Sequence, residues 1–475
     1  MKVEQIYTGC LAEAAYYIES EGEAAIIDPL RETAPYMEKA EQEGSKIRYI
    51  FETHFHADFV SGHVDLAKAT GAQIVYGPGA KTSYDIVEAE DGQEFKIGKV
   101  TIKVLHTPGH TMESATFLLF DEEGKEHAIF SGDTLFIGDV GRPDLAVKSD
   151  LTREDLAGLL FESLRNKIMV LPDETLVYPG HGAGSACGKN MSKETWDTLG
   201  HQKEVNYALR ADMTKEEFIK EVTSGILPPP QYFAKNAMMN KNGYNSIDEV
   251  LEAGQVGLDA DTFEEMASHE TTLVLDTRKP EVFAKGHIEG ALSIGIDGQF
   301  APWVGALIED LDQPILLVVE EGREEEAVTR LARVGYDNVR GYLKGGVDAW
   351  KAAGKELATV RSIQASEFEK ALEEDRNISV LDVRRYPEYY AEHVIDGINF
   401  PLDYIMNNIG DLDKNETYYV HCAGGYRSMI AVSILKANGF TGLTDVAGGF
   451  AAIKDTGIKV TDYVCPSTIV EEENN

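Results

Sequence analysis

The sequence predicts a multidomain α/β protein in which one unique domain precedes two related ones. Over about the first 225 residues, short apolar strands alternate with helical patterns, and each strand leads into a loop rich in His, Asp, Gly or Thr. Such a layout gathers polar side chains at strand ends, where binding sites are usually built. The rest of the chain is an internal repeat of about 105 residues, which indicates two copies of one domain. The clearest strands predicted in the first part are 24–27, 49–52, 74–76 and 101–105.

Three motifs carry the repeat. Leu-Asp276-Thr-Arg278 recurs as Leu-Asp382-Val-Arg384, Ile288-Glu-Gly290 as Ile395-Asp-Gly397, and Gly345-Gly346 as Gly448-Gly449. In each copy an apolar strand, at 315–319 or 417–420, leads into a helix, as in a doubly wound α/β domain. Pro228-Pro229-Pro230 interrupts the earlier pattern. We therefore predict domains at 1–245, with 228–245 as a linker or lid, at 246–358 and at 359–475.

Length, composition and charge narrow the class of protein. A chain of 475 residues suggests three domains of about 150 residues each. It has no apolar run of about 18 residues that could span a membrane, and its N-terminus shows no secretory signal. We therefore expect a cytoplasmic protein. With 81 acidic and 44 basic residues, the net charge of −37 repels nucleic acid and anionic membranes, so neither is expected as a partner.

The cysteines point to reduced thiols. Four of them, Cys10, Cys187, Cys422 and Cys465, in so long a chain do not form a disulfide framework, and no export signal accompanies them. The acidic surface does not forbid pairing of copies, and the sequence leaves the oligomeric state open.

A metal site is predicted where polar motifs follow strands. In Glu-Thr-His54-Phe-His56-Ala-Asp58 the polar side chains alternate along an extended segment and point into one pocket. Further motifs after strands supply His110, Asp133 and His181. Imidazoles and carboxylates that converge in this way suit zinc or iron. His63, which we place about one turn into the next helix, is interpreted as structural.

These motifs resemble the metallo-β-lactamase superfamily and predict its αββα sandwich. In that superfamily a His-x-His-x-Asp-His signature opens a two-metal site, and hydrolytic members such as glyoxalase II use the last His for the second metal. Phe59 stands at that position here and cannot ligate. The substitution predicts a single metal.

The one-metal branch that the domain resembles is the persulfide dioxygenases. The resemblance implies one Fe²⁺ per chain, held by His54, His110 and Asp133 in a two-His, one-carboxylate triad whose open positions take O₂ and the terminal sulfur of a persulfide. His56, Asp58 and His181 would then orient ligands or water, although His56 could also coordinate the metal.

Two further residues have open roles. Arg142, in a loop that resembles the one beside the active site in the same branch, could contact substrate or pair with Asp144. Cys187 shares a loop with His181, and could be a buried structural thiol or a persulfide carrier near the metal.

A second chemical site is predicted around Cys422. In His-Cys422-Ala-Gly424-Gly425-Tyr426-Arg427 the cysteine follows an apolar strand and precedes a helix that we expect to begin near Ser428. Inward backbone N–H groups and the helix N-terminus favour the nucleophilic thiolate. Arg427 would bind the anionic end of thiosulfate or sulfite.

The segment resembles the rhodanese active-site loop. The loop from Cys422 to Arg427 has six residues, which is the length found in sulfurtransferases. The resemblance implies that Cys422 and Arg427 are catalytic and that Arg384, Gly424, Gly425 and Tyr426 bind substrate. The first copy reads Glu320-Glu-Gly-Arg323-Glu-Glu-Glu326 at the equivalent place, without a cysteine and with five carboxylates. We therefore expect a degenerate first rhodanese-like domain and an active second one.

Nearly the whole chain thus resembles bacterial persulfide dioxygenase–rhodanese fusions. The resemblance implies O₂-dependent oxidation of a small thiol persulfide, of glutathione, coenzyme A or a similar thiol, to sulfite, with Cys422 passing sulfane sulfur to sulfite to give thiosulfate. Two alternatives stay open: a glyoxalase II-type thioester hydrolase with two metals, and a persulfide carrier or sensor.

Overall fold

The computed structural model describes residues 1–146, 151–226, 228–375 and 378–465. The chain divides into two compact units, one of residues 1–249 with 331–335 and one of 250–330 with 336–475. Among the helices of the described residues, none is both long enough and apolar enough to cross a membrane.

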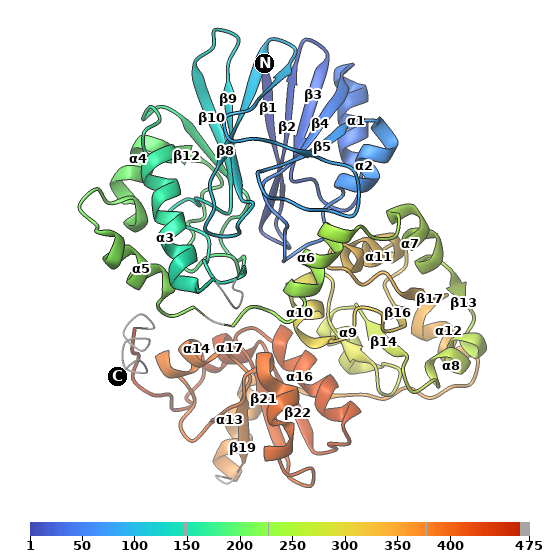
Figure 1. The fold of residues 1–475 in the computed structure, drawn as a ribbon. Coiled ribbons are helices and arrows are strands. Elements are labelled where there is room, and N and C mark those ends of the chain that lie inside the picture. The colour runs from blue at the N-terminus through green and yellow to red at the C-terminus, as the bar shows by residue number, and fades with distance from the viewer. Residues whose placement is uncertain (147–150, 227, 376–377, 466–475) are drawn as a thin grey trace. The chain divides into compact units, whose positions relative to one another are not determined.

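The first unit is a sandwich of two sheets with helices on both outer faces (Figure 1). The first sheet has the order β1 (Lys2–Thr8), β2 (Glu13–Ser20), β3 (Glu23–Ile27), β4 (Lys46–Glu52), β5 (Gln73–Tyr76), β6 (Val87–Glu88). The second has the order β12 (Asp197–Thr198), β11 (Leu176–Pro179), β10 (Glu126–Gly132), β9 (Ala115–Phe120), β8 (Val100–His106), β7 (Glu94–Ile97). This confirms the predicted αββα layering.

Alternating apolar residues explain why the sheets pack face to face. Phe51 from the first sheet contacts Phe117 from the second, with ring centroids 4.9 Å apart, and Tyr16 meets Phe130 at the same separation. These rings belong to one buried cluster fed by both sheets. Since side chains alternate along a strand, the opposite faces pack on helices. Those helices are α1 (Ala34–Glu43) and α2 (His63–Thr70) on one side, and α3 (Arg153–Ser163), α4 (Leu199–Val205) and α5 (Lys215–Thr223) on the other.

The segment 228–245, for which a linker or lid was predicted, contains the helix α6 (Phe233–Asn242). Its sequence, with Ala, Met and Lys between the prolines and Gly243, favours a helix. Two other helix starts differ slightly from prediction: His63 is the first residue of α2 rather than one turn in, and the helix after Cys422 begins at Tyr426 rather than near Ser428.

The second unit repeats one parallel α/β arrangement. Its sheets have the equivalent orders β13 (Gly257–Leu258), β17 (Val339–Leu343), β16 (Ile315–Val318), β14 (Leu273–Asp276), β15 (Leu292–Ser293) and β18 (Arg361–Gln364), β22 (Leu443–Ala447), β21 (Tyr418–His421), β19 (Ser379–Asp382), β20 (Ile398–Asn399). The first copy carries α8 (Ala260–Ala267), α9 (Pro280–Lys285), α10 (Phe300–Leu307), α11 (Glu324–Ala332) and α12 (Gly346–Ala352), after α7 (Ile247–Gly254). The second carries α13 (Ala365–Glu374), α14 (Tyr386–Ala391), α15 (Ile405–Asn408), α16 (Tyr426–Ala437) and α17 (Gly449–Ile453). The matching strand orders confirm the repeat.

Candidate metal centre and sulfur-transfer site

The predicted metal ligands lie at the carboxyl ends of strands in the first unit. His54 follows β4, His110 follows β8, and Asp133 follows β10 directly. All three are buried, and each offers a ligand atom within 4.8 Å of the others. The Nε2 atoms of His54 and His110 lie 3.9 and 3.4 Å from Asp133 Oδ2. The structure thus brings together two imidazoles and a carboxylate, a set that suits a divalent transition metal.

Hydrogen bonds determine which imidazole nitrogen faces this cluster. His110 Nδ1 donates to Arg142 O at 2.9 Å. Thr53 Oγ1 donates to Asp28 Oδ2 at 2.8 Å, and therefore accepts from His54 Nδ1 at 2.9 Å. Since each Nδ1 carries the proton, each Nε2 keeps a lone pair for a metal. Burial lowers the pKa of His54 well below its ordinary value, which favours the neutral ring that a metal requires.

Buried polar atoms support a bound cation. Among the described residues, His110 Nε2 and both carboxylate oxygens of Asp133 have no hydrogen-bond partner. Burying a carboxylate without partners is costly, and a cation at this point would satisfy these atoms together. The residues present therefore fit a metal ion.

A second group of possible metal ligands lies beside the first, next to an apolar ring. His56, Asp58 and His181 also offer buried ligand atoms within 4.8 Å of one another, and His181 Nε2 lies 3.3 Å from Asp58 Oδ2. Phe59 is fully buried beside them, with its ring centroid 4.3 Å from that of His56 and 6.4 Å from that of His181. An apolar ring thus lies directly beside this second group of side chains.

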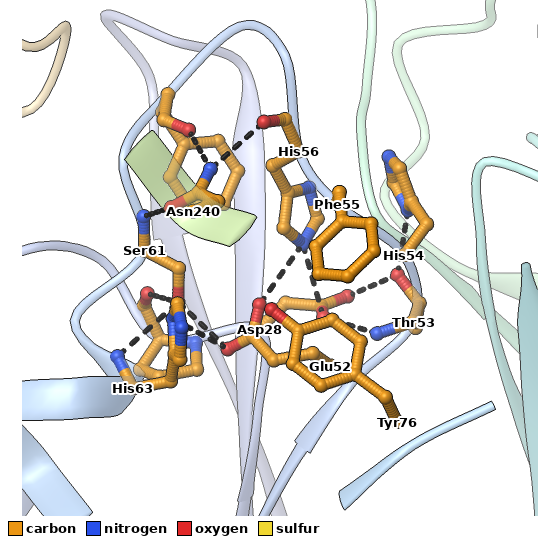
Figure 2. A network of polar contacts seen from close by, with 12 residues as sticks. Asp28, Glu52, Thr53, His54, Phe55, His56, Ser61, His63, Tyr76 and Asn240 are labelled. Atoms are coloured by element: carbon orange, nitrogen blue, oxygen red, sulfur yellow. Dashed lines mark hydrogen bonds and ion pairs between the residues drawn. The ribbon is translucent and has the colours of Figure 1, made fainter. Parts of the chain in front are cut away.

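His56 pairs with carboxylates behind the cluster (Figure 2). Its Nε2 lies 3.1 Å from Asp28 Oδ1 and 3.7 Å from Glu52 Oε2. Burial opposes the charged ring, but the Asp28 carboxylate, helped by Glu52, raises the pKa of His56 to about 9. Asp28 and Glu52 were not singled out from the sequence, although both stand at or just after a strand end, as the predicted ligands do.

Asn240 of α6, also unforeseen, fixes the loop that follows His54. Its Nδ2 donates to the carbonyls of His56 and Phe59, each at 2.8 Å, and its Oδ1 accepts from the Ser61 N–H at 2.9 Å. Figure 2 shows the Asn240 amide between Ser61 and the backbone of His56. His63 is buried nearby and bonds Tyr84 through Nε2 at 2.6 Å, a contact consistent with a structural role.

Arg142 and Cys187 belong to one connected loop structure. Arg142 forms the ion pair with Asp144, Nε to Oδ1 at 2.6 Å, and its Nη1 donates to Ala186 O. Its backbone N–H donates to Cys187 O at 3.0 Å. Cys187 is buried, and its Sγ lies within 4.8 Å of a ligand atom of Asp133 and of His181. Burial, reinforced by nearby carboxylates, raises the pKa of the Cys187 thiol well above its ordinary value.

The second site surrounds Cys422, between β21 and α16. The Gly425 N–H donates to Cys422 Sγ at 3.1 Å, and Gly425 has φ of 99°, which favours glycine. The Cys422 carbonyl accepts from the Phe450 N–H, and a Cβ on Gly449 would lie 2.4 Å from that carbonyl oxygen. The Gly448-Gly449 end of the repeat therefore allows the chain to pass close behind the cysteine.

The two arginines of this site have internal partners. Arg427 holds Glu388 in a bidentate pair, with both N···O distances 2.7 Å. Arg384 Nε lies 2.9 Å from Asp382 Oδ1, and its guanidinium carbon lies 3.8 Å from the Phe450 ring centroid. Gly424 is exposed in the loop, and Tyr426 is half-buried. The roles of these four residues in catalysis and substrate binding stay predictions.

Comparisons with known proteins identify the families of the domains that carry these two sites. The family description "Metallo-beta-lactamase superfamily" matches residues 8–181, and "Rhodanese-like domain" matches residues 259–353 and 364–456. The chain therefore belongs to the metallo-beta-lactamase superfamily and carries two rhodanese-like domains.

Particular relatives refine this class. The human mitochondrial persulfide dioxygenase ETHE1 is 31% identical over 211 residues, which are 44% of this chain and 74% of the relative. A probable hydroxyacylglutathione hydrolase of Schizosaccharomyces pombe is 32% identical over 37% of this chain and 66% of its own length. A solved metallo-beta-lactamase structure from Staphylococcus aureus, 33% identical, superposes with a TM-score of 0.62 over 72% of this chain and 98% of that one. The chain is thus a homologue of the persulfide dioxygenases and is also similar to hydroxyacylglutathione hydrolases.

Proposed function

We propose that this protein is a persulfide dioxygenase and sulfurtransferase. One Fe²⁺ would be held by His54, His110 and Asp133, and would supply redox chemistry and open coordination positions for O₂ and substrate. The overall reaction is R–S–SH + O₂ + H₂O → R–SH + SO₃²⁻ + 2 H⁺. The main observation in support is Phe59, because a hydrolytic metal pair needs a ligand at that position.

The protein's own groups prepare this site. Thr53 and the Arg142 carbonyl hold the two imidazoles with Nε2 inward. The Phe59 ring shields the side of the pocket next to His56, and His181 with Asp58 leaves a polar pair beside Asp133. The pair could hold or pass a proton from the persulfide.

Cys422 would carry sulfane sulfur. Its thiolate attacks the terminal sulfur of R–S–SH, so a new S–S bond joins Cys422 Sγ to that sulfur, the S–S bond of the substrate breaks, and R–S⁻ leaves. Sulfite then attacks the outer sulfur, releasing thiosulfate and the Cys422 thiolate. The Gly425 N–H is placed to stabilise that thiolate at the start and end of the cycle.

Purified protein tests the proposal directly. We expect one iron per chain and persulfide-dependent O₂ uptake, and we expect Cys422→Ser to abolish sulfur transfer while O₂ uptake persists. Two zinc ions per chain with thioester cleavage would favour the hydrolase instead. No turnover of either kind would leave a carrier or sensor. If the Cys422 variant lost both activities, the two-site scheme would be wrong.

A further inference from the structure

The degenerate rhodanese copy contacts the active-site loop of the other copy through Tyr426. Tyr426 directly follows Gly425, whose N–H bonds Cys422 Sγ. The Tyr426 hydroxyl reaches into the first copy and donates to Gly295 O at 2.6 Å. Burial raises the pKa of this phenol above its ordinary value, so the hydroxyl stays a donor. The cysteine loop is therefore anchored outside its own domain.

The Tyr426 ring fits only because the first copy has glycines beneath it. A Cβ built on Gly298 would lie 2.3 Å from Tyr426 Cε2 and 2.4 Å from Cζ. A Cβ on Gly295 would lie 3.3 Å from Cε2. Even an alanine at position 298 would collide with the ring, so the Tyr426 side chain would have to leave its present position.

The two glycines distinguish the first copy from the second. The Ile294 N–H donates to Asp276 O, as the equivalent Phe400 N–H donates to Asp382 O. A few residues further along, the Gly298 N–H donates to Gly295 O in the first copy. The equivalent bond in the second copy joins the Tyr404 N–H to Pro401 O. The active copy thus has proline and tyrosine where the degenerate copy has Gly295 and Gly298.

Residues of the degenerate loop hold this glycine segment. Arg323, which lies where the active copy has its cysteine loop, pairs with Asp297 at 2.8 Å. Arg330 of α11 donates to Ile296 O at 2.6 Å. Both arginines also bind Glu326. The altered loop is therefore part of the platform for Tyr426.

We infer that the degenerate copy positions the active-site loop of the second copy, with Gly295 and Gly298 forming a slot for Tyr426. Tyr426 in turn keeps the Gly425 N–H against Cys422 Sγ. Tyr426, Gly295 and Gly298 are positioning residues in this scheme. The inference rests on the proposed sulfur-carrying role of Cys422, but its geometry can be tested without turnover.

The test is Gly298→Ala in the full-length, metal-loaded chain. Alkylation of Cys422 by iodoacetamide is followed as a function of pH, with the Cys422 peptide quantified by mass spectrometry. Loss of one N–H bond to a thiolate should raise the pH midpoint by about one unit, and lower sulfur transfer about tenfold. Gly410→Ala is the matched control, because a Cβ there meets no heavy atom within 4 Å.

A double-mutant cycle with Tyr426→Ala separates positioning from general destabilisation. If the slot acts through the Tyr426 ring, Gly298→Ala should cause no further change in the pH midpoint in a protein that already carries Tyr426→Ala. Tyr426→Phe, which keeps the ring and loses the bond to Gly295 O, should shift the midpoint in the same direction by less. An unchanged midpoint in Gly298→Ala, or simple addition of the two effects, would overturn the inference. Should Gly298→Ala not fold, an unshifted midpoint in Tyr426→Phe would do so.

The two proposals can fail separately. A protein without any persulfide turnover would contradict the proposed function, while its Cys422 alkylation profile would still report on the slot. Conversely, normal transfer in wild-type protein with no effect of Gly298→Ala would remove only the positioning role.

Discussion

Arg427 and Glu388 are joined by two parallel hydrogen bonds of 2.7 Å, Nη1 to Oε2 and Nη2 to Oε1. Although burial acts against the charged carboxylate, Arg427 keeps the pKa of Glu388 below its ordinary value. An anionic sulfur donor that binds Arg427, as proposed, would therefore have to compete with Glu388 for this guanidinium.

We accordingly expect Glu388→Gln to improve the use of thiosulfate. Weakening a partly buried pair should release Arg427 and lower the KM for thiosulfate about fivefold, with little change in kcat. Steady-state transfer from thiosulfate to cyanide measures both constants. Glu392→Gln, which removes the surface pair with Lys454, is the control. An unchanged or higher KM in Glu388→Gln would show that Arg427 does not bind the donor.

Phe59→His should restore a ligand for a second metal. Together with Asp58 and His181 it would complete a second set beside Asp133, so the metal content should rise from one toward two per chain, and persulfide-dependent O₂ uptake should fall. Elemental analysis after metal loading gives the stoichiometry. Phe59→Leu keeps an apolar side chain, so its metal content should stay at one ion per chain. Two metals in the wild-type protein would refute the single-metal assignment.

Thr53→Val should weaken metal binding without touching a ligand. The change removes the hydroxyl that links Asp28 to His54 Nδ1, so the ring loses its fixed orientation and affinity should drop about tenfold to a hundredfold. Competition with a chelator measures the metal affinity of each variant. Thr175→Val is a matched control, since Thr175 Oγ1 is buried without a hydrogen-bond partner among the described residues. Equal affinities for both variants would argue against the orienting role of Thr53.

Asn240→Ala should destabilise the metal loop. It removes three hydrogen bonds to buried backbone groups of residues 56–61, at a cost of about 3 kcal/mol in the free energy of unfolding of the first unit. Denaturant unfolding monitors this change. Asn236→Leu on the same helix is the comparison, because the Asn236 amide atoms are buried without partners among the described residues and should be dispensable. A larger loss for Asn236→Leu would contradict this account of α6.

Local sequence patterns predicted the convergence of His54, His110 and Asp133, because all three follow strands whose carboxyl ends meet at one edge, whereas the αββα layers were expected from the resemblance to a known superfamily. The same reasoning found the repeat and Cys422. It could not find Asn240, because this residue bonds a loop about 180 positions earlier in the chain. Sequence periodicity indicates local helices and strands and carries no information on such distant contacts.

Tyr426 was predicted only as a substrate contact, because nothing in the sequence around it indicates a partner in the other copy. Its anchor at Gly295 lies in the other copy, and only the folded arrangement pairs them. Asp28 was overlooked for a different reason: a single Asp after a strand resembles a turn residue until its bonds to Thr53 are seen.

The bond from Tyr426 to Gly295 ends on a main-chain oxygen. In a fragment that begins at the second rhodanese-like copy, the Tyr426 ring and hydroxyl would therefore be exposed to water. Because the missing acceptor is a main-chain oxygen of the first copy, a side-chain substitution would not replace it. Loss of the first copy should therefore slow sulfur transfer at Cys422 while leaving the cysteine itself in place.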